Sequence, residues 1–305
     1  MTTRIAGAGA AAALPVDIAD AKRRIHPWRI ATSILVVVAA LLLMRFAATN
    51  PKFEWPTVAE YLFDPSVLRG LWMTLALTAI CMTAGCLLGV LVAAGQLSEV
   101  TVARAVSKLF VTVFRGVPPL VQLIFWFNLA YLVPSVELSI PGIGVVFSGA
   151  TNTFMTPFVA AIIGLSLHEA AYMAEIIRAG ILSVDQGQTD AGKAMGFTSG
   201  RAFRRIVLPQ AMRVIIPPTG SQLIGLLKGT SLVSVIGMTD LLLSVQLIYN
   251  RNYEVVPLLV VSVFWYLAVV TLLSAVQRRI EIRFGQGHAN TPSRSVRRLM
   301  KGQAR

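Results

Sequence analysis

Six long apolar runs divide the chain into candidate membrane spans and polar connections. Each run has few charged residues and is long enough for a helix to cross the roughly 30 Å hydrocarbon core of a bilayer. The pattern therefore predicts an all-α membrane protein with six transmembrane helices. The expected spans are Ile30–Ala48, Gly70–Ala94, Val117–Val133, Phe154–Tyr172, Val214–Met238 and Val255–Val276.

The overall composition agrees with this interpretation. Apolar residues make up 55% of the 305 residues, charged residues make up only 13%, and the mean hydropathy is +0.70. A soluble domain of this length would need a more polar surface. The run Ile30–Ala48 lies behind a leader of 29 residues, which predicts a retained helix and not a cleaved signal peptide.

The basic residues are concentrated in alternate connections. Of the 27 Lys and Arg residues, 22 lie in the N-terminal segment, the second and fourth connections and the C-terminal segment. The positive-inside rule places these segments, and both termini, in the cytoplasm. Topology thus accounts for the formal net charge of +13. We expect the basic tail, residues 283–305, to lie against anionic lipid headgroups and not to bind nucleic acid.

The second apolar run contains small residues that indicate packing. Gly85 and Gly89 form a pair that would let another helix approach closely. Cys81 and Cys86 are five residues apart, which is neither a disulfide framework nor a metal-ligand spacing. We therefore interpret all four as packing residues.

No motif typical of catalysis stands out. The stretch from Gly187 to Ala194 nearly matches a phosphate-binding loop. However, Ala194 stands where a Ser or Thr would hold magnesium, and the stretch follows a membrane span instead of a buried strand. We expect no catalytic residue, no bound cofactor and no metal site in this chain, so a membrane-embedded enzyme is the weaker hypothesis.

The long cytoplasmic connection between the fourth and fifth runs has helical patterning of its own. A first helix is expected over Val184–Met195, ending where Gly196 adopts a left-handed conformation. A second helix, capped by Thr198 or Ser199, would carry apolar side chains on one face and arginines on the other, and would end at Pro209. Such a bent amphipathic element is suited to docking into a groove on another protein, or to lying on the membrane surface.

The same connection resembles the EAA loop of ATP-binding-cassette (ABC) importer permeases, whose pattern is EAA-x3-G-x9-I-x-L-P. Asp190 replaces the usual Glu, and Gly192 replaces the usual Ala. Four further stretches are similar to polar amino-acid permeases of the histidine, glutamine, glutamate and arginine type: RGVPPLVQL, AAYMAEIIRAGI, LPQA and LLKGTSL. The expected coupling-loop residues are Gly187, Asp190, Ala191, Gly192, Gly196, Phe197, Ile206, Leu208 and Pro209.

The resemblance implies a type I ABC importer transmembrane domain in the bacterial inner membrane. It assigns the permease domain to residues 67–282, the coupling loop to 182–212 and a peripheral first helix to 30–48, with a cytoplasmic segment at 1–29. The implied partners are a second permease subunit, ABC ATPase subunits and an extracytoplasmic solute-binding protein that delivers a polar amino acid. The ATPases, and not this chain, would bind ATP and Mg.

Ionisable residues inside the apolar runs are candidates for the substrate pathway, because such groups are costly in lipid and usually face a cavity or a partner. Substrate contact and helix packing are both open roles for Glu169 and Lys228. Glu175, three residues before Arg178, is expected to form a local salt bridge. The candidate pathway residues are Glu169, Ser221, Gln222, Lys228, Thr230 and Ser231.

Several alternatives stay open from the sequence. The substrate could be another small polar solute, and the amino acid carried is not specified. The permease core could be a homodimer or a heterodimer. A stand-alone secondary transporter is the alternative from a different class.

Overall fold

The computed structural model describes residues 27–140 and 144–285 of the chain. They belong to two compact units, residues 1–53 and residues 54–305, which are described separately. The first unit contains the helix α1 (Pro27–Thr49) and the 3₁₀ turn η2 (Pro51–Phe53). No residue of Trp28–Thr49 is buried. A helix that is apolar all round and exposed is suited to contact with lipid.

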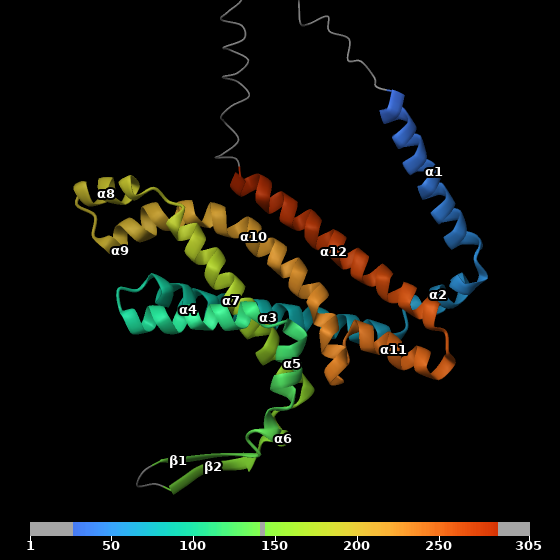
Figure 1. Ribbon diagram of the computed structural model, residues 1–305, viewed down its shortest axis with the longest axis horizontal. Helices are drawn as coiled ribbons and strands as arrows, with labels where there is room; N and C mark the ends of the chain where they lie inside the picture. Colours follow the sequence, from blue (N-terminus) through green and yellow to red (C-terminus); the bar gives the residue numbers. More distant parts are fainter. Residues whose placement is uncertain (1–26, 141–143, 286–305) are drawn as a thin grey trace, which may run out of the picture. The chain divides into compact units, whose positions relative to one another are not determined.

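The second unit is almost entirely helical (Figure 1). Its elements are α2 (Trp55–Leu62), α3 (Pro65–Leu97), α4 (Thr101–Gly116), α5 (Pro119–Phe127), η3 (Leu129–Tyr131), β1 (Ser135–Ile140), β2 (Gly144–Ala150), α6 (Thr151–Phe154), α7 (Pro157–Leu182), α8 (Gln186–Ala194), α9 (Ser199–Ala202), a π-helical turn η4 (Phe203–Val207), α10 (Leu208–Gly229), η5 (Thr230–Ile236), α11 (Leu241–Asn252) and α12 (Val255–Gly285).

The all-α membrane architecture is confirmed. Within the described residues, four unbroken helices could cross a bilayer: Trp28–Thr49, Pro65–Leu97, Pro157–Leu182 and Val255–Phe284. Two further spans are bent pairs, α4 with α5 at 102° and Ser199–Ile236 with α11 at 45°. The count of six spans therefore holds when each bent pair is one crossing.

The third span differs from the single helix expected over Val117–Val133. The structure instead has α4, a sharp bend, and an α5 of only nine residues. The bend lies at Val117 and Pro118, which are extended with ψ of 132° and 139°. Consecutive prolines explain it, because proline lacks an N–H donor and disfavours helical geometry in the residue before it.

The connection after this span contains an antiparallel hairpin that the sequence interpretation did not include. Strands β1 and β2 pair from Ser135 with Ala150 to Ile140 with Gly144, with an irregularity between Leu138 and Ser139. The apolar positions Val136, Leu138 and Ile140 alternate along β1, which is a strand pattern.

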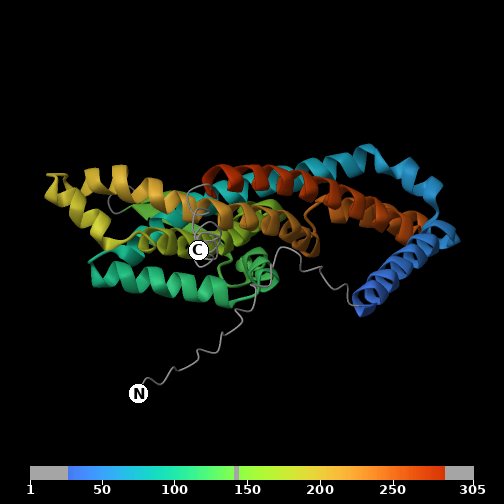
Figure 2. The ribbon, with the colours of Figure 1, turned by 90° about the horizontal axis from the view of Figure 1, so that it is seen from above.

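Helix α7 is the centre of the second unit. It packs against α3, α4, α5 and α10, while α10 also runs beside α12 (Figures 1 and 2). Glycines allow α3 to approach α7 closely. A Cβ atom added at Gly85 would lie 2.7 Å from Cβ of Glu169, and one added at Gly89 would lie 2.7 Å from Cβ of Met173. The predicted packing role of the glycine pair is confirmed.

Two of the three apolar clusters in the described residues link most of these helices. One joins α3, α5 and α7 to the end of the fifth span and includes Leu77, Leu123, Leu165, Leu226 and Val233. The other joins α2, α3, α11 and α12 and includes Val58, Val67, Leu241, Val245, Leu258 and Val261. The lipid-facing side chains outside these clusters remain exposed, as expected for a protein whose solvent is partly hydrocarbon.

Candidate functional site

The coupling element, residues Asp185–Val207, begins with α8 and turns at Gly196. The Asp185 carboxylate caps α8 by accepting a hydrogen bond of 2.7 Å from the Gly187 N–H. Gly196 has a φ of +83°, and the Phe197 N–H donates to the Gly192 carbonyl at 3.0 Å. The left-handed conformation predicted for Gly196 is confirmed. Only glycine adopts it without strain from a Cβ atom.

The two arms of the coupling element pack directly against each other at Gly192. A Cβ atom added there would lie 2.6 Å from Cδ1 of Ile206 and 3.7 Å from Cβ of Ala202. Gly192 and Ala202 are buried. The glycine costs about 1 kcal/mol of helix propensity relative to alanine. Here that residue also lets Ile206 of the second arm approach the backbone of α8.

The prediction that Pro209 ends the second helix is wrong. Helix α9 continues through the π-helical turn Phe203–Val207 into α10, and Pro209 lies in the first turn of α10. The Leu208 N–H donates to the Phe203 carbonyl five residues back, and this π-helical spacing carries the helix past Pro209. The second arm of the coupling element is thus continuous with the fifth span.

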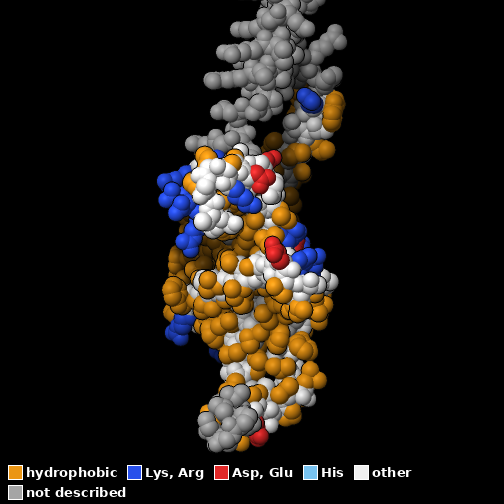
Figure 3. All heavy atoms as spheres, turned by 90° about the vertical axis from the view of Figure 1, so that its left-hand side faces the viewer, with side chains coloured by type: hydrophobic (Ala, Val, Ile, Leu, Met, Phe, Trp, Pro, Cys, Tyr) orange, Lys and Arg blue, Asp and Glu red, His pale blue; other side chains and the backbone are white. Residues whose placement is uncertain are grey.

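The outer surface of the coupling element is basic. Arg201, Arg204 and Arg205 line a cavity of about 400 Å³. Figure 3 looks onto this side of the molecule and shows Lys and Arg side chains gathered in its upper half, above a largely hydrophobic surface. Apolar groups are exposed beside them, since Met195 is 69% and Phe203 is 40% exposed. The second helix was expected to carry its apolar side chains on one face and its arginines on the other, but Phe203 is exposed as the arginines are.

The other expected loop residues are distributed over both faces. Gly187, Asp190, Ala191, Leu208 and Pro209 are exposed. Phe197 and Ile206 are half-buried and help to hold the two arms together. The surface available to a partner therefore combines the acidic Asp190 of α8 with the arginines of the second arm.

Of the two ionisable candidate pathway residues, Glu169 is buried and Lys228 is exposed. Glu169 is 3% exposed at the contact of α7 with α3, and its Oε1 atom has no hydrogen-bond partner among the described residues. A buried carboxylate oxygen without a partner is energetically costly. The site is therefore suited to a cationic group or a proton.

The polar residues of the fifth span have mainly local partners. The hydroxyl of Thr230 donates to the Leu227 carbonyl at 2.7 Å, and that of Ser231 donates to the Lys228 carbonyl at 2.8 Å. Ser221 accepts a hydrogen bond of 3.1 Å from the side chain of Gln277 on α12.

Lys228 is exposed and Gln222 is half-buried in this single chain. The ion pairs of the described residues do not include Lys228 or Glu169. Substrate contact stays a prediction for all six pathway residues.

The expected salt bridge of Glu175 is confirmed. Its Oε2 atom lies 2.9 Å from Nη2 of Arg178, and the two residues are three positions apart on α7. The structure adds Arg115, whose Nη1 atom lies 4.0 Å from the same oxygen. Glu175 thereby connects the end of α4 to α7.

Asp240 was interpreted as part of an external connection, but the structure buries it completely. Its Oδ1 atom accepts a hydrogen bond of 2.8 Å from the Leu243 N–H and caps α11. Its Oδ2 atom accepts one of 3.3 Å from the Tyr266 hydroxyl on α12. Thr74 on α3 completes the junction by accepting from the Leu241 N–H at 3.0 Å. An Asp directly before an apolar run is an N-cap signal that could have identified this role.

The architecture and the coupling element agree with what comparison with known proteins finds. The family described as binding-protein-dependent transport system inner membrane component matches residues 85–286. The chain belongs to this family. The match includes the coupling element and every candidate pathway residue.

Curated relatives extend over most of the chain. The arginine transport system permease protein ArgU of Corynebacterium glutamicum is 40% identical over 288 residues, which cover 93% of this chain and 89% of ArgU. The L-cystine transport system permease protein TcyB of Bacillus subtilis is 37% identical over 230 residues, covering 75% of this chain and 90% of TcyB.

Solved structures show the same fold. A crystal structure of an amino acid ABC transporter with histidines matches with a TM-score of 0.62 and 31% identity, covering 74% of this chain and 97% of the matched chain. An inward-facing structure of the MetNI methionine ABC transporter matches with a TM-score of 0.53 at 22% identity, covering 72% and 95%. The second likeness supports the fold alone.

Proposed function

We propose that this chain is a permease subunit of an ABC importer that carries a polar amino acid across the bacterial inner membrane. Membership of the transport family supports the permease role. Relatives named for arginine, cystine and glutamate or aspartate transport support an amino acid as the substrate. The importer would contain a second permease subunit, ABC ATPases and an extracytoplasmic solute-binding protein.

The observation that carries the coupling role is the continuity of the coupling element with two spans. Its first arm, α8, begins four residues after α7 ends at Leu182. Its second arm continues through the π-helical turn into α10 without a break. A force applied to the element therefore reaches the fourth and fifth spans directly.

In the proposed cycle, the partner ATPases bind ATP and Mg, and this chain contributes no catalytic residue. Closure of the ATPases moves α8 and α9, and the attached α7 and α10 reorient the pathway between its two faces. The angle between the arms has to be fixed for this transmission. Gly196 sets the angle, and the contact of Gly192 with Ile206 holds it.

The proposed orientation places the coupling element and both termini in the cytoplasm. The basic surface of Arg201, Arg204 and Arg205 supports this orientation, because Lys and Arg accumulate on the cytoplasmic side of membrane proteins. The hairpin β1–β2 and the connection before α12 then lie on the external side, where the solute-binding protein would dock.

Within the pathway, Glu169 is the candidate for the ammonium group of the substrate and Lys228 for its carboxylate. The unpartnered Oε1 atom of Glu169 supports the first assignment. The exposed ammonium group of Lys228, without an ion pair among the described residues, supports the second. Both groups would face the substrate only in the assembled permease core.

The proposal is tested by Gly196→Val, with Gly200→Val as the matched control. Neither glycine has another atom within 4 Å of an added Cβ, but only Gly196 has a positive φ. The left-handed conformation costs a residue with a Cβ atom about 1–2 kcal/mol. Valine at Gly196 should therefore change the angle between the arms, while valine at Gly200 should be tolerated.

The measurement is ATP hydrolysis by the complex reconstituted in liposomes with its solute-binding protein and a panel of polar amino acids. We expect substrate-stimulated hydrolysis and uptake for the wild type and for Gly200→Val. For Gly196→Val we expect basal hydrolysis without stimulation. Full stimulation of Gly196→Val would refute the coupling role, and uptake by the chain without any ATPase would refute the importer assignment.

A further inference from the structure

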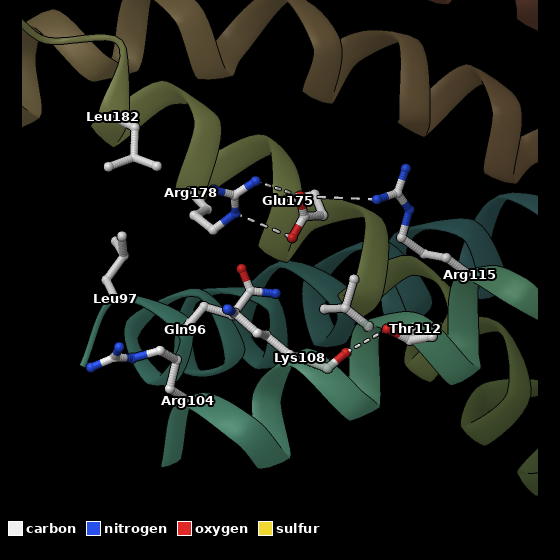
Figure 4. A pocket seen from close by; sticks show the side chains of 10 residues that line it. Gln96, Leu97, Arg104, Lys108, Thr112, Arg115, Glu175, Arg178 and Leu182 are labelled. Atoms are coloured by element: carbon white, nitrogen blue, oxygen red, sulfur yellow. Dashed lines mark hydrogen bonds and ion pairs between the residues drawn. The ribbon is translucent and has the colours of Figure 1, made fainter. Parts of the chain in front are cut away.

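A basic cavity lies apart from the candidate pathway residues, between the end of α3, the helix α4 and the end of α7 (Figure 4). Its volume is about 590 Å³. Four cationic side chains line it, and the only carboxylate among its lining residues is Glu175. The four cations are Arg104, Lys108, Arg115 and Arg178.

Glu175 is already shared by two of these cations. Arg178 binds it through two hydrogen bonds of 2.9 and 3.3 Å. Arg115 lies 4.0 Å from it on the other side, and its guanidinium also lies 5.0 Å from the centre of the Tyr172 ring. Figure 4 shows the two guanidinium groups on opposite sides of the carboxylate. The single carboxylate of Glu175 is thus shared by two guanidinium groups, whose positive charges it only partly compensates.

The other two cations of the cavity, Arg104 and Lys108, have no carboxylate partner among the described residues. Arg104 donates hydrogen bonds of 3.1 and 3.2 Å to the backbone carbonyls of Ser98 and Glu99, which fixes its position without neutralising its charge. The ammonium group of Lys108 has no hydrogen-bond or ion-pair partner within the described ranges. The cavity therefore holds an uncompensated positive charge that attracts an anion.

Exposed apolar side chains lie at the rim of the same cavity. Leu97 and Leu182, at the ends of two membrane-spanning helices, line the cavity and are 37% and 59% exposed. The face of α4 opposite the cations carries a second apolar surface whose side chains are 45% to 70% exposed. This surface consists of Val102, Val106, Leu109 and Val113. A spacing of three to four residues places them on one face of the helix.

We propose that this cavity binds the phosphate group of an anionic phospholipid from the cytoplasmic leaflet. A lipid satisfies both features of the site, because its headgroup supplies the anion and its acyl chains cover the leucines at the rim. Basic cavities between membrane helices on the cytoplasmic side are suited to such headgroups. A free phosphate ion would pair with the cations and leave the leucines exposed.

A bound headgroup would link α4 to the end of α7, close to the coupling element. Leu182 is the last residue of α7, and α8 begins at Gln186. The lipid would thus hold the bend between α4 and α5 against the helix that leads into the coupling element. The proposal does not depend on which solute the protein carries.

The test uses the full-length protein, expressed with its partner subunits and purified in a neutral detergent free of phosphorus. Short-chain phosphatidylglycerol, short-chain phosphatidylcholine or inorganic phosphate is added. Thermal unfolding and native mass spectrometry then report binding. The variant is Lys108→Gln, because Lys108 has no structural partner to lose. Lys108→Arg retains the charge, and Arg213→Gln removes an exposed cation of α10 that does not line the cavity.

We expect phosphatidylglycerol to raise the unfolding temperature of the wild type in a saturable manner, and phosphatidylcholine to have little effect. Lys108→Gln should weaken phosphatidylglycerol binding by about five-fold, the contribution typical of one cation near an anionic lipid surface. Arg213→Gln and Lys108→Arg should bind as the wild type does.

Three results would overturn the proposal. Equal binding of phosphatidylglycerol to the wild type and Lys108→Gln would place the lipid elsewhere. Stabilisation by inorganic phosphate equal to that by phosphatidylglycerol, and lost in Lys108→Gln, would assign the cavity to a free anion. Equal effects of phosphatidylcholine and phosphatidylglycerol would show that charge does not select the lipid.

Discussion

Asp240 is completely buried where η5 meets α11, and its replacement by alanine tests the junction of three helices. Asp240→Ala removes the cap of α11, because the Leu243 N–H loses its acceptor at 2.8 Å. It also removes the acceptor of the Tyr266 hydroxyl on α12. Asp240→Asn retains a side-chain oxygen in the same position and is the isosteric control.

The expected loss follows from these two contacts. Loss of a helix cap costs about 0.5–2 kcal/mol. A hydrogen bond between membrane helices contributes about 0.6–1.7 kcal/mol. Asp240→Ala should therefore lower the free energy of unfolding by about 1–4 kcal/mol, whereas Asp240→Asn should lower it by less than about 1 kcal/mol. At about 2 °C per kcal/mol for a chain of this size, alanine should lower the Tm by about 2–8 °C.

The assay is thermal unfolding of the purified protein in one detergent, extended to a double-mutant cycle with Tyr266→Phe. The cycle isolates the contact between the two side chains. If the hydrogen bond of 3.3 Å is formed, the two substitutions together should cost less than the sum of their separate effects. A Tm of Asp240→Ala equal to that of the wild type, or strictly additive effects, would refute the reasoning.

Three further predictions concern topology, the fifth span and the carboxylate pair of Glu54 and Glu254. A reporter inserted near Gly200 and one fused after Arg305 should both report a cytoplasmic position in a fusion assay, and an external signal from either would refute the orientation. Lys228→Met should raise the substrate concentration needed for uptake while detergent stability is unchanged; intact uptake with lowered stability would instead indicate a packing role. A hydrogen bond with Glu54 raises the pKa of Glu254, so the stability that Glu254 contributes is present below its ordinary pKa of 4.5 and is lost as pH rises through the raised value. Glu254→Gln should therefore have the higher Tm at neutral pH, with the difference vanishing in acid, and a pH-independent difference would contradict this assignment.

The spans that the sequence predicted well are those whose signal is local. The second, fourth and sixth apolar runs became α3, α7 and α12 because length and hydropathy alone favour a helix in lipid. The prediction of a single helix over the third run was wrong because hydropathy is a local signal. Hydropathy detected the apolar part of this run, but not the bend at Pro118 or the basic α4 before it.

In the coupling element, too, local features were predictable from the sequence and tertiary contacts were not. A positive φ at Gly196 was predictable, because a glycine after a helix pattern commonly ends it. The position of Pro209 inside a continuous helix was not predictable, because only the π-helical turn before it places this proline in the first turn of α10. The role of Gly192 required knowledge of Ile206, a residue of the other arm.

The sequence by itself determined that this protein is helical and spans a membrane, since hydropathy and charge distribution are properties of short segments. The permease role came from the resemblance of its coupling loop to those of importer permeases. The tertiary structure decided which polar groups meet. Glu169 faces Gly85 across a helix contact, and Asp240 joins Tyr266 inside the protein although hydropathy placed it in an external connection. The tertiary structure also brought Lys108 of α4 into one cavity with Arg178 of α7. Such contacts join residues far apart in the chain, and they depend on how the helices cross, which no local pattern encodes.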